Sequence, residues 1–223
     1  MISLKRAAKL KQKKYREAER LFLAEGDNLI SESPVPPLYD FDDPDSIRRL
    51  SALTTPAGPI AVFPFLDVSL GELFERSERL VLLHGVQDPG NVGTIIRAAH
   101  AFGTGVVLSR NCADLYNSKT VRATMGSIFH TPIAREIRTI PFLEEARGAG
   151  FTPVAAMPET GSSSRALPLG KLLVVVGAEG SGLPDEVVEA CESSVKIPAR
   201  AASLNAAVAA SILLYEAYVR VLP

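Results

Sequence analysis

The chain has 223 residues, of which 47% are hydrophobic, and its 24 lysine and arginine side chains nearly balance 25 aspartate and glutamate side chains. This composition is ordinary for a globular protein and excludes wholesale disorder and collagen-like repeats. Two cysteines, Cys112 and Cys191, are too few for a disulfide framework or a four-cysteine zinc site, which favours a cytoplasmic location. No uncharged apolar run is long enough to span a membrane, and the N-terminus is too charged for a secretory signal.

Basic residues are concentrated at the start of the chain. Residues 1–20 carry eight basic side chains and two acidic ones, whereas residues 25–50 are mainly acidic. A basic segment on a nearly neutral chain indicates contact with a polyanion, most plausibly a nucleic acid, with Lys13, Lys14 and Arg16 as candidate contacts. A solvated helix face explains the same pattern without any ligand.

Residues 1–70 form a compositionally distinct unit. A helix over 4–14 capped by Ser3 is expected, because the segment is rich in Lys, Leu and Ala and lacks glycine and proline. The other expected elements are a strand over 21–24, a helix over 27–30, a loop over 31–44, a helix over 47–53 and a strand over 60–65. Pro64 predicts that this last strand lies at a sheet edge. A charged linker over 71–78 follows, and a second domain is expected over 79–223.

From residue 79 onward, apolar strands alternate with helices. The expected strands are 79–84, 106–108, 151–156, 172–176 and 195–198, and the expected helices are 94–102, 119–125, 141–147, one from residue 184, and 203–219. Strands that are apolar throughout predict an α/β fold with a parallel sheet covered on both faces. Ligands bind such sheets at the carboxyl ends of the strands.

The first of these ends is the turn over 85–93, which precedes an expected helix. Gly90 and Gly93 allow the backbone to approach a ligand closely, and the helix N-terminus attracts anions. Asn91 and Arg97 are the candidate functional side chains of this stretch, and a tight turn with Arg97 as a plain surface charge is the less favoured alternative. The stretch lacks the Gly-x-Gly-x-x-Gly fingerprint, which argues against a nicotinamide-dependent oxidoreductase.

Two later strand ends are also rich in small and polar residues. Three glycines surround Glu179 in the stretch 177–182, which predicts a backbone with positive φ angles and an acid held at the strand end. The stretch from Ser203 to Ser211 begins an alanine-rich helix, for which Ser203 is a candidate N-cap. Asn205, in the first turn of that helix, is harder to explain as a structural residue alone.

These three stretches, in this order, resemble the three motifs of the SpoU/TrmH family of RNA ribose 2′-O-methyltransferases, within the SPOUT superfamily. The resemblance covers about residues 79–220. Residues 1–70 resemble the small substrate-binding domain that many members carry, although the cues at 21–26 and 54–59 are weaker. This N-terminal unit is shorter than its counterparts around residues 31–50.

The resemblance implies a C-terminal segment threaded as a deep trefoil knot, which the alternation of strands and helices does not suggest. It implies S-adenosylmethionine as cofactor and a homodimer with its active site near the subunit contact. The residues that it assigns to the cofactor are Ala155, Ala156, Gly177, Ile197 and Leu204. Those matching the family's catalytic positions are Asn91, Arg97, Glu179, Ser203 and Asn205, and Arg122 and Gly126 match a segment facing RNA.

The expected activity is therefore methylation of a ribose 2′-hydroxyl, in ribosomal RNA rather than transfer RNA because of the extra N-terminal unit. A non-catalytic RNA-binding protein is the alternative, since the segment 198–202 beside the cofactor is shorter than in most members. His84, His100 and His130 share no ligand spacing, so no metal is expected. A guanidinium is a poor base, so we expect Arg97 to bind phosphate and stabilise developing alkoxide charge.

Overall fold

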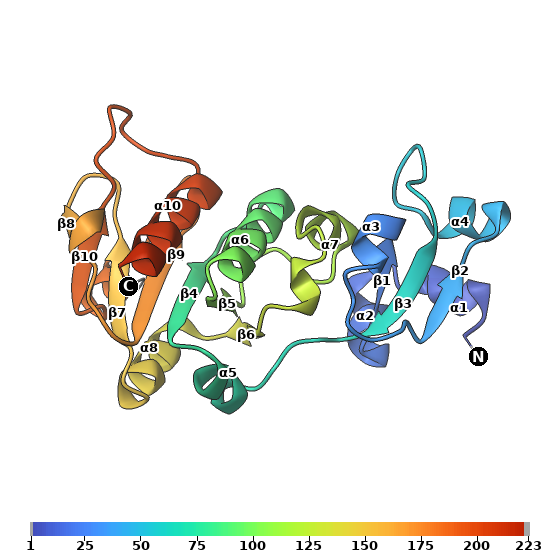
Figure 1. Ribbon diagram of the computed structural model, residues 1–223, viewed down its shortest axis with the longest axis horizontal. Helices are drawn as coiled ribbons and strands as arrows, with labels where there is room; N and C mark the ends of the chain where they lie inside the picture. The colour runs from blue at the N-terminus through green and yellow to red at the C-terminus, as the bar shows by residue number, and fades with distance from the viewer. Residues whose placement is uncertain (1, 221–223) are drawn as a thin grey trace.

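The computed structural model describes residues 2–220, which contain two β-sheets at different places along the molecule's long axis (Figure 1). The first sheet has three antiparallel strands in the order β1-β3-β2. The elements of this N-terminal part are α1 (Leu4–Lys9), α2 (Lys13–Glu19), β1 (Leu21–Glu25), α3 (Asp27–Ile30), β2 (Tyr39–Phe41), α4 (Pro44–Leu50) and β3 (Ile60–Pro64). Within residues 2–220, no helix is long and apolar enough to cross a membrane.

Several elements of this part differ from the prediction. Ser3 caps α1 as expected, but the helix predicted over 4–14 is broken between Lys9 and Lys13 into two helices. The stretch predicted as a loop over 31–44 contains the short strand β2. The prediction that β3 lies at an edge is wrong, because β3 is the central strand. Pro64 is tolerated there because β2 pairs only with residues 60–62, so no β2 partner needs an N–H from Pro64.

The second sheet has seven parallel strands in the order β6-β5-β4-β9-β7-β10-β8, which confirms the predicted α/β class. Its strands are β4 (Arg79–His84), β5 (Gly105–Ser109), β6 (Ile133–Ile137), β7 (Thr152–Ala156), β8 (Ser162–Ser163), β9 (Leu172–Gly177) and β10 (Ser193–Lys196). The intervening helices are α5 (Leu70–Arg76), α6 (Pro89–Ala101), α7 (Ser118–Ala123), α8 (Thr139–Gly148), α9 (Asp185–Glu189) and α10 (Ala206–Val219), with short 3₁₀ turns at Ser127–Phe129 and Ser164–Ala166. The edge strands β6 and β8 were not predicted.

Helices cover both faces of this sheet, as the apolar strands predict. Val81 and Leu83 of β4 pack with α6 and α10, whereas Leu80 and Leu82 pack with α5 and α8. This alternation follows from the period of two in a strand, which sends successive side chains to opposite faces. The segment predicted as a charged linker over 71–78 is mostly helix α5, whose Leu73 is fully buried against the sheet.

Aromatic rings join the three-stranded sheet to the segment between β5 and β6. Phe22 of β1 lies 4.9 Å from Tyr116, and Phe63 of β3 lies 4.8 Å from Phe129, measured between ring centroids. The Tyr116 hydroxyl accepts hydrogen bonds from the backbone N–H groups of Leu66 and Asp67, and donates to the Asp67 carboxylate at 2.8 Å. Burial and the neighbouring Asp67 charge raise the pKa of Tyr116, so the phenol keeps its proton. The N-terminal part therefore shares one core with the large sheet.

Candidate active site

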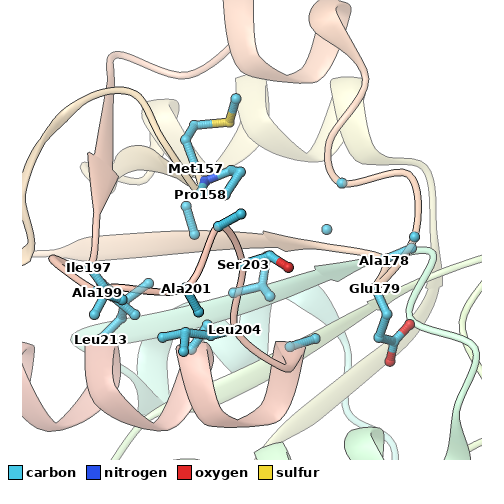
Figure 2. A pocket seen from close by; sticks show the side chains of 18 of the residues that line it. Met157, Pro158, Ala178, Glu179, Ile197, Ala199, Ala201, Ser203, Leu204 and Leu213 are labelled. Carbon is cyan, nitrogen blue, oxygen red and sulfur yellow. The ribbon is translucent and has the colours of Figure 1, made fainter.

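A cavity of about 320 Å³ lies at the carboxyl ends of β7, β9 and β10. Three segments line it, the end of β7 with the residues after it (156–158), the turn after β9 (176–182) and the stretch from β10 into α10 (195–213). In Figure 2, Met157 and Pro158 lie on one side, Leu204 and Leu213 on the opposite side, and Glu179 at one end. Three of the four expected strand ends therefore form one hollow, and the turn over 85–93 is not among the described residues that line it.

The turn after β9 owes its shape to two close backbone approaches. A Cβ added to Gly177 would lie 2.7 Å from Leu183 N and still closer to the backbone of Gly182. Gly182 has a φ of +66° and donates its N–H to Ala178 O at 3.0 Å. The prediction of positive φ at all three glycines is wrong, because only Gly182 adopts it and Gly177 is needed for space. The turn thereby brings Glu179 to the cavity rim.

Three of the predicted catalytic side chains form a hydrogen-bonded chain. Asn91 Nδ2 donates to Glu179 Oε1 at 2.5 Å, and Asn205 Nδ2 donates to Asn91 Oδ1 at 3.1 Å. Asn205 Oδ1 in turn accepts the N–H groups of Ala207 and Val208 at the start of α10. Each amide is therefore fixed in orientation, and the chain links α6 and α10 to the carboxylate at the rim.

Asn205 has the helix-capping role that was expected of Ser203. Asn205, not Ser203, is the N-cap of α10, so the interpretation of Ser203 as a cap is wrong. Ser203 instead lines the cavity together with Leu204. An Asn side chain caps as well as a Ser side chain does, and the helix begins where the chain of hydrogen bonds to Asn91 holds Asn205.

Helix α6 begins at Pro89, five residues before the predicted start at residue 94. Asp88 caps it by accepting the Asn91 N–H at 2.9 Å, and this bond and Lys119 hold the pKa of Asp88 below its usual range. Gly93 is not at a ligand site, because a Cβ there would lie 2.8 Å from Thr120 O of α7. Its role is therefore to let α6 and α7 pack closely.

The early start of α6 also changes the position of Arg97. Arg97 lies six residues after Asn91, which places it about 9 Å further along the helix and about 240° around its axis. Its side chain is exposed and is not among the described residues that line the cavity. The expectation that Arg97 points into the crevice of its own chain is therefore wrong.

Four of the five expected cofactor residues line the cavity: Ala156, Gly177, Ile197 and Leu204. Ala155 does not, because it is fully buried on the other face of the sheet with the α8 and α9 side chains. Met157, Pro158 and Leu213 also line the cavity and were not expected. The position of Met157 and Pro158 directly after β7 is the signal by which the sequence indicates them.

Much of the basic N-terminal segment is engaged within the protein. Lys13 Nζ lies 3.2 Å from Glu136 Oε1, and Lys14 Nζ lies 4.8 Å from the centre of the Tyr15 ring. Lys11 Nζ donates to the carbonyl oxygens of Arg49 and Ser51, both at 2.8 Å. The segment is therefore folded structure rather than a free basic arm, and seven of its eight basic side chains remain exposed, all except Arg16.

Arg16 and Arg122 lie in the junction between the two sheets, away from the first cavity. Arg16 is only 4% exposed and forms a salt bridge with Asp114, so it is not the surface contact that we expected. Arg122 Nη1 lies 3.9 Å from the carboxylate of Glu25, which is itself buried. The two arginines line a second, smaller cavity together.

The histidines and cysteines have structural surroundings. His84 Nδ1 lies 2.8 Å from Thr139 Oγ1, and burial lowers the pKa of His84. His100 and His130 stack with ring centroids 4.9 Å apart. Burial raises the pKa of Cys191 to about 11, which makes its thiol unreactive near neutral pH. In the part of the chain that the structure describes, His, Cys, Asp and Glu side chains form no group able to hold a metal ion.

A parallel sheet with a cavity beyond its strand ends, rimmed by a fixed Asn–Asn–Glu chain, defines the class of α/β protein that binds a small ligand beside a polar site. Comparison with known proteins identifies the family. The family model described as "SpoU rRNA Methylase family" matches residues 78–215, and the chain belongs to this family.

Among the most similar relatives is the 23S rRNA (guanosine(2553)-2′-O)-methyltransferase RlmP of Bacillus subtilis, which is 31% identical over 93% of this chain and 92% of its own. The AdoMet-bound rRNA methyltransferase from Sinorhizobium meliloti has a TM-score of 0.87 and 30% identity over 99% of this chain and 95% of that chain. The SpoU methyltransferase AviRb from Streptomyces viridochromogenes, in complex with the cofactor AdoMet, has a TM-score of 0.86 and 26% identity over 97% of each chain.

Proposed function

We propose that this protein transfers a methyl group from S-adenosylmethionine to a ribose 2′-hydroxyl of ribosomal RNA. The observation that carries the proposal is the convergence of Glu179 and Ser203 on one cavity, with Asn91 bonded to Glu179 and Asn205 bonded to Asn91 behind its rim. Ribosomal RNA is favoured over transfer RNA because the similarity to the B. subtilis enzyme for 23S rRNA extends over the N-terminal part as well. A cytoplasmic location follows from this substrate and from the two unpaired cysteines.

The cavity suits S-adenosylmethionine in size and chemistry. A volume of about 320 Å³ falls in the range of small-molecule sites. The apolar walls at Ile197, Leu204 and Leu213 suit the adenine ring, and the backbone of the turn at 177–182 offers hydrogen bonds to polar groups. When bound, S-adenosylmethionine supplies an electrophilic methyl group on a positively charged sulfur. The Glu179 carboxylate at the rim would favour binding of this cationic cofactor and would not itself lower the barrier, because the positive charge on sulfur disappears as the methyl group leaves.

The protein's own contribution to the reaction is mostly positioning. Asn91 and Asn205 hold Glu179 in one orientation, and Ser203 offers a hydroxyl to the ribose from the cavity wall. Arg97 binds the phosphate next to the target ribose and stabilises negative charge on the 2′-oxygen, while a phosphate oxygen or water takes the proton. Since Arg97 is exposed on α6, it meets the RNA from outside the cavity of its own chain.

Two architectural features are part of the proposal. The first is a deep trefoil knot formed by the C-terminal segment, supported by the position of β9 between β4 and β7 and by the return of α10 to pack on α6. The second is a small substrate-binding domain over residues 1–70, with the methyltransferase domain over 79–223. The N-terminal domain has a three-stranded sheet of its own and a small core formed by side chains of α1, α4 and β3, and both features support this division.

We also propose that two copies associate through α6 and α10. Val208 and Tyr215 lie seven residues apart on α10, hence on one side of the helix, and are 49% and 52% exposed. Arg97 is exposed on the neighbouring helix α6. Association through this face places the Arg97 side chain at the contact between the copies, which accounts for its distance from the cavity of its own chain.

Calorimetric titration with S-adenosylmethionine distinguishes the enzyme from a non-catalytic RNA-binding protein. We expect one binding site per chain with a Kd in the micromolar range, equivalent to about −8 kcal/mol. The segment 198–202 lines the cavity through Ala199, Ala201 and Ala202 despite its short length, so we expect it to retain the site. The absence of a heat signal, with RNA binding intact, contradicts the proposal and supports the non-catalytic alternative.

A further inference from the structure

Between β10 and α10, residues 198–203 form a strap along the first cavity. In Figure 1 this stretch belongs to the loop that stands out beyond the carboxyl ends of the strands. Every residue of the strap is exposed, whereas Ile197 and Leu204 at its two ends are half-buried. Both of these end residues line the cavity, so the strap is anchored at its ends and exposed between them.

No hydrogen bond holds the strap in place. Within residues 2–220, neither its backbone nor its side chains donate or accept one. The turn over 177–182, which lines the same cavity, differs because the Gly182 N–H closes it on Ala178 O at 3.0 Å. Exposed segments without hydrogen bonds open at little cost in free energy. The strap is therefore a movable wall of the cavity.

The inner side of the strap consists of small side chains. Ala199, Ala201, Ala202 and Ser203 line the cavity, and Figure 2 labels three of them around it. A ligand in the cavity packs against these side chains and gives the strap contacts that it otherwise lacks. Ordering a flexible segment costs conformational entropy, and a ligand that holds the strap offsets this cost. The affinity for that ligand therefore depends on anything else that orders the strap.

Arg200 lies on the outer side of the strap. It is the only charged residue between Lys196 and Glu216. It is exposed and, unlike Ala199 and Ala201 on either side of it, does not line the cavity. Its guanidinium forms no ion pair or hydrogen bond within residues 2–220. An exposed guanidinium without a partner is suited to bind an oxyanion outside the cavity.

Ser203 indicates which oxyanion reaches Arg200. The two residues are three positions apart in the strap, and the function proposed above places Ser203 at the target ribose. A ribose within an RNA chain has a phosphate group on each side, and Arg97 accounts for only one of the two. A ribose held at Ser203 therefore brings a second phosphate to the outer side of the strap.

We propose that substrate RNA closes the strap over the bound cofactor through a contact between Arg200 and a phosphate group. The inference rests on the proposed function for the identity of both ligands. The cofactor orders the strap from the inside and RNA orders it from the outside, so each ligand lowers the entropy cost of binding the other. By thermodynamic linkage, each raises the affinity for the other by the same factor. Arg200 is thus a positioning residue that acts on the cofactor through the strap.

Trypsin tests the movement of the strap, because Arg200 is the only cleavage site between Lys196 and Arg220. We expect cleavage in the free protein, detected by mass spectrometry as a C-terminal fragment that begins at Ala201. S-adenosylhomocysteine, the product of methyl transfer, should slow this cleavage about fivefold, and unmodified ribosomal RNA transcripts should slow it further when both are present. A free protein that resists cleavage after Arg200, or that is cut equally fast with both ligands, would contradict a strap that ligands close.

Calorimetric titration with S-adenosylhomocysteine, with and without saturating RNA transcript, measures the coupling without turnover. In the wild type, RNA should raise the affinity at least about fivefold, the lower end of the usual range for coupled sites. Arg200→Ala should reduce this factor to less than about twofold. Its affinity in the absence of RNA should stay at the wild-type value, because Arg200 does not line the cavity. Arg200→Lys should keep most of the coupling, since lysine also binds phosphate as a point charge.

Arg76→Ala is the matched control for the loss of an exposed arginine. Arg76 ends α5 just before the amino end of β4, at the opposite edge of the sheet from the cavity. This variant should show the wild-type coupling factor.

Two calorimetric results overturn the inference. One is an affinity of the wild type for S-adenosylhomocysteine that RNA does not change, and the other is full coupling in Arg200→Ala. In both cases, methylation of ribosomal RNA by the wild-type protein shows that the proposed function stands. If the wild type neither binds S-adenosylhomocysteine nor methylates ribosomal RNA, the proposed function itself fails, and the inference fails with it.

Discussion

Gly177→Ala is expected to lower the affinity for S-adenosylmethionine by about 5- to 150-fold, equivalent to 1–3 kcal/mol of overpacking. The added Cβ would lie 2.7 Å from Leu183 N and closer still to the Gly182 backbone. Because these neighbours are backbone rather than a flexible side chain, the whole turn at 177–182 must shift. Calorimetric titration of the variant with S-adenosylmethionine measures the loss.

Gly180→Ala is the matched control for this prediction. Gly180 lines the same cavity, but nothing lies within 4 Å of a Cβ added to it and its φ is not positive. We therefore expect Gly180→Ala to bind S-adenosylmethionine within threefold of the wild type. If Gly177→Ala binds S-adenosylmethionine with the wild-type affinity, the close approach of Gly177 to the Gly182 backbone does not shape the site.

Arg97→Ala should lower kcat for methyl transfer by about 100- to 1000-fold, the usual effect of losing one donor that stabilises transition-state charge. Arg97→Lys should lose most of this activity as well, because lysine lacks the planar fork that binds phosphate through two hydrogen bonds. Neither variant should change the affinity for S-adenosylmethionine, since Arg97 lies outside the cavity lining. Single-turnover methylation at saturating cofactor separates these effects.

Arg147→Ala provides a control for removing an arginine as such. Arg147 lies on α8, on the opposite face of the sheet from α6, and its described contact is a hydrogen bond to Ala190 O at 2.7 Å. We expect it to keep near wild-type activity. Full activity of Arg97→Lys would show that a point charge suffices, and full activity of Arg97→Ala would remove Arg97 from the reaction.

The large sheet was predictable because its central strands are unbroken apolar runs. β4 and β9 read as buried strands from Leu80–Leu83 and Leu172–Val176, and both occupy central positions. The strands that escaped prediction, β2, β6 and β8, lie at sheet edges and carry polar residues, and β2 and β8 are only three and two residues long. The order of the strands depends on long-range pairing, which no local pattern records.

The start of α6 shows how a readable signal was missed. Asp88-Pro89 is a typical N-cap followed by proline at the first helical position. Gly90 and Gly93 led to the prediction of a turn instead, because glycine is unfavourable inside helices. The structure explains Gly93 by its contact with α7, a tertiary cause that the local sequence does not reveal.

The composition of the candidate site was predictable, but its connections were not. The convergence of Asn91, Glu179 and Asn205 follows from parallel strands ending at one edge of the sheet. Because α6 begins five residues before the predicted start, Asn91 and Arg97 lie on the same helix, and their separation of six residues places them on different sides of it. Local sequence also does not reveal ion pairs between the N-terminal segment and residues far along the chain. One example is Glu17, whose Oε1 lies 2.8 Å from Arg135 Nη1.

Mapping of ribose methylation across total RNA, from cells with and without this protein, tests the central claim most directly. We predict that one ribose of ribosomal RNA loses its 2′-O-methyl group when the protein is absent. Wild-type protein should restore the group, whereas Arg97→Ala should not. Unchanged methylation of every ribosomal ribose would contradict the claim, and a change confined to transfer RNA would contradict the assigned substrate.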